Sequence, residues 1–373
     1  MDEMIRIPTV IYRGGTSKAV FLKENDLPRD AAQRDKIICA IFGSPDKRQI
    51  DGLGGADPLT SKLAIVGPSS RPDADIDYTF GQVSIDSPAI FYGGVCGNVS
   101  AAVGPYAIDE GFVRPKEPET TVRIHCTNNG RIIEAKVPVI GNRVKIGGDF
   151  AIDGVPGTAA KIELNWSDMV GANTGRLLPT GNVKDILEVE GVGKITVSIV
   201  DVANPGVFVK AADLGLKGTE SPDEIDSNAE LLKKSDAITK AAMAKINNIA
   251  LLTYVAPSLN YTSYVTGQTV TADQVDFLVR MIFMGKLHKT FAASMINCCG
   301  TAAMVPGTVV NEVASPGLAG RGMVRMGHPS GSAELEGIEI SETPVGIEVK
   351  KIIVYRTARR LMEGYALVKK ETV

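Results

Sequence analysis

The fold is decided by residues 92–103, YGGVCGNVSAAV, in which a glycine pair precedes Cys96 and small apolar residues follow it. The run after Cys96 has the length and composition of a buried helix, so the pattern predicts that this thiol lies at a helix N-terminus. Backbone N–H groups without partners and the helix dipole favour thiolate over thiol at such a place. We therefore interpret Cys96 as a proton-transferring or nucleophilic thiol, with a small buried core residue as the alternative.

A similar run, CGTAA, occurs at residues 299–303. In each half of the chain a strand with a glycine turn comes first, the Cys-Gly step opens a helix of small residues, and hairpins follow. This order predicts an α+β protein of two pseudo-symmetric domains, residues 1–182 and 183–356, that face each other across a cleft. Each domain is expected to be a mostly antiparallel β-structure wrapped around a central helix. Strands in hairpin clusters disfavour a doubly wound parallel sheet, which needs regular alternation with helices.

Local patterns predict the elements around these two runs. A helix is expected to open at residues 27–30 and to stop at Gly43. Alternating strands on either side of Asn129-Gly130 predict a β-hairpin. The capping box at residues 221–224 predicts one helix that reaches about residue 246. A second cap at residues 271–274 predicts a helix that runs past Met284.

Composition and charge exclude several classes of protein. The chain has 373 residues, a net charge of −3 and 44% hydrophobic residues, which suits two or three soluble domains and no nucleic-acid partner. The sequence has neither a signal-peptide core nor an apolar run that would span a bilayer, so we expect a cytoplasmic protein without a membrane partner. Its five scattered cysteines form neither a disulfide framework nor a set with metal-ligand spacing, so no metal site is predicted.

Two glycine-rich segments carry further candidate residues. In residues 13–18, RGGTSK, the hydroxyls of Thr16 and Ser17 together with backbone N–H groups can hold a carboxylate, although a plain turn is the alternative. Residues 51–62, DGLGGADPLTSK, end in Ser61 and Lys62. A lone lysine is usually a solvated surface group, but an ammonium beside a thiol would favour the thiolate or act as a base itself. Neither segment has the spacing of a Walker A loop or a dinucleotide fingerprint.

The second half offers one more anion-binding pattern. Residues 326–332, MGHPSGS, combine a turn with hydroxyls and a histidine, and they predict an anion nest formed by His328, Ser330, Gly331 and Ser332. A simple proline turn is the alternative. Lys286 is a further candidate ligand, although its place late in the expected helix also suits complementation of the helix dipole.

Five motifs, in this order along nearly the whole chain, resemble the PrpF protein family: residues 13–18, 51–62, 94–98, 327–331 and 356–362. The resemblance implies the diaminopimelate-epimerase fold, with residues 357–373 returning to the first domain. It implies acid/base roles for Lys62 and Cys96. It also implies contacts to substrate carboxylates from Ser17, Gly97, Asn98, Ser330 and Gly331. The family is cofactor-free, so the resemblance implies no cofactor and no metal.

Epimerase relatives of this family use two opposed thiols, one in each domain. Residues 294–299, SMINCC, depart from the form that the family shows at this place, so whether Cys298 or Cys299 takes part stays open.

Members of the family move a proton between carbons that lie next to carboxylates. The resemblance therefore implies an isomerase that shifts a C=C bond in an unsaturated di- or tricarboxylate, first of all 3-methylitaconate to 2,3-dimethylmaleate. Isomerisation of aconitate or methylaconitate and tautomerisation of oxalomesaconate are the alternatives within the family. A racemase would need a clear second thiol, and an accessory protein of an iron–sulfur dehydratase is the alternative from another class. The expected partner is a small carboxylate, and a homo-oligomer is left open.

Overall fold

The chain divides into two compact units in the computed structural model, which describes residues 3–318, 321–343 and 346–372. Unit 1 comprises Met1–Ala151, Gly157–Leu164 and Arg356–Val373, and unit 2 comprises Ile152–Pro156 and Asn165–Tyr355. Residues 152–156 and 165–182, which the sequence-based boundary gave to the first domain, therefore belong to unit 2.

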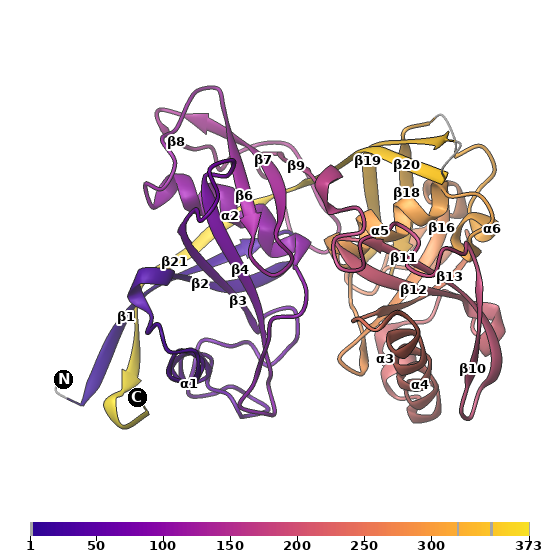
Figure 1. Ribbon diagram of the computed structural model, residues 1–373, viewed down its shortest axis with the longest axis horizontal. Coiled ribbons are helices and arrows are strands. Elements are labelled where there is room, and N and C mark those ends of the chain that lie inside the picture. Colours follow the sequence, from indigo (N-terminus) through magenta and orange to yellow (C-terminus); the bar gives the residue numbers. More distant parts are fainter. Residues whose placement is uncertain (1–2, 319–320, 344–345, 373) are drawn as a thin grey trace. The chain divides into compact units, whose positions relative to one another are not determined.

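Unit 1 is a β-structure around one central helix, α2 (Gly97–Asp109), which is buried from Gly97 to Ile108 (Figure 1). Small residues let the strands approach this helix closely: a Cβ at Gly104 would lie 2.9 Å from a methyl group of Val137. Hydrogen-bonded neighbours follow the order β21-β1-β2-β3-β4-β6-β7, in which β2–β3 and β4–β6 are parallel and the other pairs antiparallel. The N- and C-terminal strands thus run side by side.

The other elements of unit 1 are β1 (Met4–Gly14), β2 (Ser17–Lys23), α1 (Ala31–Phe42), β3 (Lys62–Pro68), β4 (Ile76–Val83), β5 (Ile90–Phe91), β6 (Glu119–Cys126), β7 (Arg131–Ile140), β8 (Arg143–Val144), β9 (Ile162–Asn165) and β21 (Ala358–Lys369). Helix α1 begins after the Asp30 cap, ends at Gly43 with φ +74°, and packs its isoleucines into a second core cluster with β2, β3 and β21. The predicted helix and the hairpin β6–β7 are both confirmed.

Unit 2 repeats the plan of unit 1 around its own central helix, α5 (Ala293–Met304), which is buried along its whole length (Figure 1). Its strand order is β10-β11-β12-β13-β16-β18-β19-β20, in which β12–β13 and β16–β18 are parallel and the other pairs antiparallel. The elements are β10 (Asp185–Val189), β11 (Gly193–Val202), β12 (Asn204–Lys210), α3 (Pro222–Asp226), α4 (Ala229–Ile246), β13 (Leu251–Pro257), β14 (Tyr261–Thr262), β15 (Thr269–Val270), β16 (Phe277–Phe283), β17 (Lys286–Leu287), α6 (Val309–Val313), β18 (Met323–His328), β19 (Gly331–Thr343) and β20 (Gly346–Arg356).

The sequence of parallel and antiparallel pairs is the same in the two units when β21, β1, β2, β3, β4, β6 and β7 are matched with β10, β11, β12, β13, β16, β18 and β19. The central helices α2 and α5 occupy the same place in this order, between the fifth and sixth of the matched strands. The predicted fold class, α+β with two pseudo-symmetric domains around central helices, is therefore confirmed.

Three local predictions are wrong. The helix expected from Ser221 to residue 246 is two helices, because α3 ends with Ser227 as its C-cap and Asn228 then caps the start of α4. The helix expected past Met284 is a single 3-10 turn, Ala272–Gln274, followed by strand β16, whose pairing with β13 and β18 overrides the cap. The step Cys299-Gly300 does not open a helix, since α5 begins six residues before Cys299.

Within residues 3–318, 321–343 and 346–372, no helix is both long and apolar enough to cross a bilayer.

Candidate active site

Cys96 is the N-cap residue of α2, as the sequence predicts. Its backbone is extended, with φ −108° and ψ 104°, and its carbonyl accepts hydrogen bonds from the backbone N–H and the hydroxyl of Ser100, each at 2.9 Å. Only 8% of the residue is exposed, and the first turn of α2 carries no acidic side chain. The thiol therefore lies where backbone N–H groups point outward from the helix, which is a favourable place for negative charge.

The turn between β1 and β2 packs directly on this first turn of α2. A Cβ at Gly14 would collide with the carbonyl oxygen of Asn98, and one at Gly15, which has φ +49°, would collide with the Asn98 side chain. The close approach lets the Asn98 amide donate to Thr16 Oγ1 at 3.1 Å and accept from the Thr16 N–H at 3.4 Å. The structure thus joins three sequence-predicted elements, the glycine turn, Thr16 and Asn98, at one end of the central helix.

Ser17 completes this turn. The residue is 2% exposed, and its hydroxyl has no hydrogen-bond partner within the described residues. A buried hydroxyl without a partner is costly unless a ligand or water pairs with it. Ser17 is therefore well suited to a ligand oxygen.

Lys62 begins β3, which packs against α2. The residue is 5% exposed, its Nζ donates to Gln82 Oε1 at 2.8 Å, and it lies over the Phe80 ring at 5.4 Å from the centroid. Gln82 is held in turn, since its amide donates to the carbonyls of Ser61 and Pro58 at 2.9 and 3.2 Å. Lys62 is therefore an oriented, buried ammonium and not a solvated surface group.

Ser61 is used within the unit. Its hydroxyl donates to the carbonyl of Val83 at 2.9 Å and accepts from the Gln49 amide at 2.8 Å. These bonds fix the chain just before Lys62, so Ser61 supports the position of the lysine. The ligand-binding role expected for Ser61 from the sequence stays a prediction.

The predicted residues of unit 2 form a group of their own. His328 and Gly331 are opposite each other across the tight β18–β19 turn, and the Ser330 N–H donates to His328 Nδ1 at 3.2 Å. The Ser330 hydroxyl donates to the carbonyl of Lys289 at 2.5 Å. Lys286 is exposed on β17 and is not joined to this turn by any hydrogen bond or ion pair of the described residues.

A carboxylate already lies on this turn. Asp153 accepts from the Ser332 N–H at 2.6 Å, and a Cβ at Gly331, where φ is +140°, would collide with it. The turn thus binds a carboxylate oxygen, as an anion nest is expected to do, but here the carboxylate is supplied by the chain. Sequence reasoning missed Asp153 because nothing in the stretch around it marks a contact with residues 331–332.

The two cysteines of α5 are core residues. Both are fully buried, and Cys298 Sγ donates to the carbonyl of Val200 at 3.1 Å. Burial raises the pKa of Cys298 to about 12 and that of Cys299 well above its usual range, so both thiols stay protonated at neutral pH. The N-cap of α5, which corresponds to Cys96 in the repeat, is Ala292. The thiol at a helix N-terminus is therefore a feature of unit 1 alone among the described residues.

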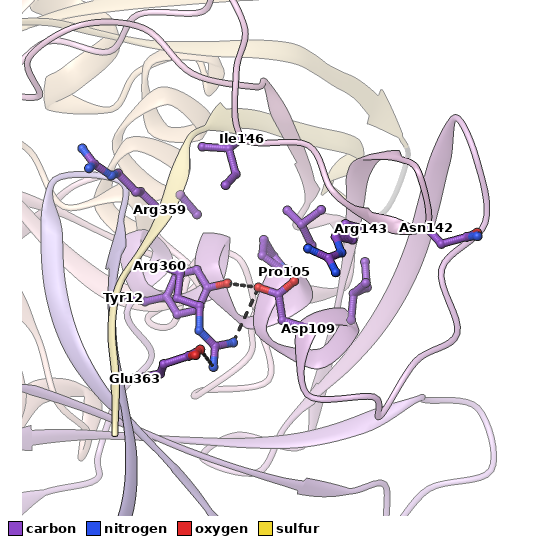
Figure 2. A pocket seen from close by; sticks show the side chains of 12 residues that line it. Tyr12, Pro105, Asp109, Asn142, Arg143, Ile146, Arg359, Arg360 and Glu363 are labelled. Carbon is purple, nitrogen blue, oxygen red and sulfur yellow. Dashed lines mark hydrogen bonds and ion pairs between the residues drawn. The ribbon is translucent and has the colours of Figure 1, made fainter. Parts of the chain in front are cut away.

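The opposite end of α2 borders a cavity of about 540 Å³ in unit 1, drawn in Figure 2. There the Tyr12 hydroxyl donates to Asp109 at 2.5 Å, and Arg360 lies 3.7 Å from the same carboxylate. Arg360 also pairs with Glu110 and Glu363, at 2.7 and 2.8 Å, so the carboxylates around this guanidinium are already paired within the chain. The cavity lies away from Cys96, which caps the other end of the helix.

Residues 3–318, 321–343 and 346–372 contain no group of three His, Cys, Asp or Glu side chains that could hold a metal ion.

Comparisons with known proteins give the same family that the five motifs resemble. A family model described as "PrpF protein" matches residues 4–369. The 3-methylitaconate isomerase of Eubacterium barkeri is 50% identical over 383 residues, which cover 99% of each chain. The 2-methyl-aconitate isomerase of Shewanella oneidensis is 39% identical over 392 residues, with 98% of each chain covered.

Two solved structures show similar folds. A crystal structure of methylitaconate-delta-isomerase has a TM-score of 0.79 at 48% identity and covers 99% of this chain and 97% of its own. A hydroxyproline epimerase from Agrobacterium vitis has a TM-score of 0.60 at 10% identity, with 98% and 93% covered, and its likeness concerns the fold alone.

Proposed function

The chain belongs to the PrpF protein family, and from this premise we propose that it is an isomerase that shifts a C=C bond in an unsaturated dicarboxylate, converting 3-methylitaconate to 2,3-dimethylmaleate. The observation that carries the choice of substrate is the 50% identity to a 3-methylitaconate isomerase over 99% of both chains, against 39% to a 2-methyl-aconitate isomerase.

The reaction is an allylic proton shift. A base removes the C–H proton next to one carboxylate, the double bond moves, and a proton returns to the methylene carbon two positions away. The intermediate is a dienolate with additional negative charge on a carboxylate. Catalysis therefore needs a base, an acid and donors that hold the developing charge.

Unit 1 contains groups suited to each of these roles. Cys96 and Lys62 are the proposed acid/base pair, because one is a thiol at a helix N-terminus and the other a buried ammonium. The backbone N–H groups of Gly97 and Asn98 at the start of α2 and the Ser17 hydroxyl are the proposed donors to the substrate carboxylate.

A substrate panel tests the proposal. The purified protein is incubated with 3-methylitaconate, trans-aconitate, methylaconitate and oxalomesaconate in D2O, and isomerisation is followed by ultraviolet absorbance and deuterium incorporation by NMR. We expect the highest kcat/KM with 3-methylitaconate and deuterium at the new methyl group. A higher kcat/KM with a tricarboxylate would refute 3-methylitaconate as the substrate but would leave the proposed reaction class unchanged. If the protein turns over none of the four compounds but supports the activity of an iron–sulfur dehydratase, it is an accessory protein and the proposed isomerase activity is wrong.

Another prediction concerns the cysteines of α5. Replacement of Cys298 or Cys299 by alanine is expected to leave kcat and KM within about twofold of the unsubstituted protein, because a fully buried, protonated thiol cannot exchange protons with a substrate. Steady-state kinetics at neutral pH check this, and circular dichroism verifies folding. A large loss of deuterium exchange in a folded Cys298→Ala variant would restore the two-thiol mechanism of the epimerases.

A further inference from the structure

The turn between β18 and β19 in unit 2 holds a carboxylate that the chain itself supplies. Asp153 Oδ2 accepts from the Ser332 N–H at 2.6 Å and from the Ser332 hydroxyl at 3.4 Å. Gly331 has φ +140°, and a Cβ at this residue would collide with the Asp153 carboxylate. The turn is therefore shaped to receive one carboxylate oxygen, because it presents donors and has no side chain in the way.

The turn is held in place by contacts that do not involve Asp153. Three consecutive carbonyl groups, those of residues 329–331, each accept a hydrogen bond from the segment 261–264: from the Tyr264 N–H at 2.7 Å, the Ser263 hydroxyl at 3.0 Å and the Tyr261 hydroxyl. The Ser332 N–H should therefore keep its position when the Asp153 carboxylate is removed.

A buried cation lies next to this turn. Arg280 is 1% exposed, and its guanidinium lies over the Tyr261 ring at 5.3 Å from the centroid. Within the described residues, all the hydrogen bonds of this guanidinium go to backbone carbonyls, those of Glu220, Val279 and Gly327. Positive charge that is buried without an ion pair favours an anion on the neighbouring turn.

Asp153, by contrast, comes from an exposed loop. Backbone hydrogen bonds between Phe150 and Ala159, at 3.2 and 3.0 Å, close a loop of residues 151–158, in which Asp153 is exposed. Within the described part of the chain, both hydrogen bonds of the Asp153 carboxylate go to Ser332. The carboxylate thus fills the turn without holding the turn together.

We propose that Asp153 is a specificity-determining residue: its carboxylate occupies the anion nest of the β18–β19 turn, keeps a substrate carboxylate out of it, and so favours an unsaturated dicarboxylate over a tricarboxylate. The inference rests on the proposed function and on the motif at residues 327–331, from which Ser330 and Gly331 are expected to contact a substrate carboxylate. A carboxylate attached to the chain competes at a high effective concentration, so a third carboxylate of a substrate has to displace it.

The test is Asp153→Ala, with Asp149→Ala as the matched control. Asp149 is an exposed aspartate four residues earlier that makes no hydrogen bond or ion pair within residues 3–318, 321–343 and 346–372, so its removal changes the charge equally but leaves the nest filled. Isothermal titration calorimetry measures the Kd of tricarballylate and of glutarate, which is the same chain without the central carboxylate.

We expect the ratio of the glutarate Kd to the tricarballylate Kd to rise about tenfold in Asp153→Ala, since the third carboxylate gains a charge-assisted hydrogen bond. Asp149→Ala should keep the ratio of the unsubstituted protein. Asp153→Asn, which retains an acceptor oxygen but loses the charge, should lie between the two. Thermal unfolding checks that the variants are folded, and Asp153→Asn carries the comparison if Asp153→Ala is not.

Turnover separates this inference from the proposed function. In Asp153→Ala the kcat/KM for trans-aconitate, relative to that for 3-methylitaconate, should rise about tenfold. Equal Kd ratios in the folded variants and the unsubstituted protein overturn the inference, even if 3-methylitaconate is isomerised. A raised ratio in Asp153→Ala, in a protein that isomerises nothing, supports the occupied nest and refutes the proposed function.

Discussion

Cys96→Ser is expected to lower kcat for 3-methylitaconate by about 10³-fold and to abolish deuterium exchange at the carbon next to the carboxylate. A serine hydroxyl fits the N-cap position of α2 and is a better cap than cysteine, so the helix should start at the same residue. The change removes the thiol that we propose to transfer the proton and supplies a hydroxyl, which is a much weaker acid. The loss should therefore lie in kcat, with KM nearly unchanged.

Cys39→Ser is the matched control for this variant. Cys39 is a buried cysteine of α1, in the outer helix of unit 1, and its pKa is raised by burial and by the Asp35 carboxylate. We expect Cys39→Ser to keep the turnover of the unsubstituted protein, with at most a loss of stability because a hydroxyl is buried in place of the thiol. If Cys96→Ser kept more than about a tenth of kcat while folded, the thiol would have no acid/base role.

The part of this site that the sequence could predict is the part that depends on neighbouring residues in the chain. Asp30 and Gly43 mark the two ends of α1, and the residues around Cys96 mark the start of α2, because caps and glycines act within one turn of helix. The repeat of the two units was also visible, since it is an order of elements and not a set of contacts.

The part that could not be predicted depends on pairing between distant strands. The cap at Thr271 indicates a helical turn correctly, but the pairing of residues 277–283 with β13 and β18 makes the next segment a strand. The Cys-Gly step at residue 299 resembles that at residue 96, yet α5 starts earlier because Ala293–Ile296 are already buried in the core of unit 2. Local similarity therefore named the wrong residue as the counterpart of Cys96.

Gln82 was missed for the same reason. Only the register of β4 with β3, in which Lys62 is opposite Gln82, shows that the glutamine side chain meets the lysine. A buried glutamine that orients a buried lysine has no signature in the sequence. The signal that could have found it is a polar residue on the otherwise apolar face of a strand, at Tyr78, Phe80 and Gln82.

Lys62→Ala is expected to lower kcat/KM by about 10²- to 10⁴-fold, the range in which positioned acid/base groups contribute. The Lys62 residue is 5% exposed, its Nζ is held at 2.8 Å from Gln82 Oε1, and β3 carries no second Lys or Arg that could take its place. The variant leaves Gln82 Oε1 without its donor, which should cost about 1–3 kcal/mol of stability, and folding is therefore checked by thermal unfolding. Lys18→Ala, a change of the same kind on β2, is the control that should keep full turnover.

Rescue by an added amine decides what Lys62 does. Truncation to alanine leaves room beside Gln82 for ethylammonium, so turnover of Lys62→Ala should rise with the concentration of ethylamine and saturate. If the amine restores kcat and deuterium exchange together, the group transfers protons. If the variant instead keeps its kcat and the amine restores only KM, Lys62 binds the substrate carboxylate. Cys96 must then act with a different acid/base partner. A buried ammonium near a thiol favours the thiolate, so Cys96 should be alkylated more slowly in Lys62→Ala at neutral pH. An unchanged alkylation rate would show that Lys62 does not affect Cys96, and the proposed acid/base pair would be wrong.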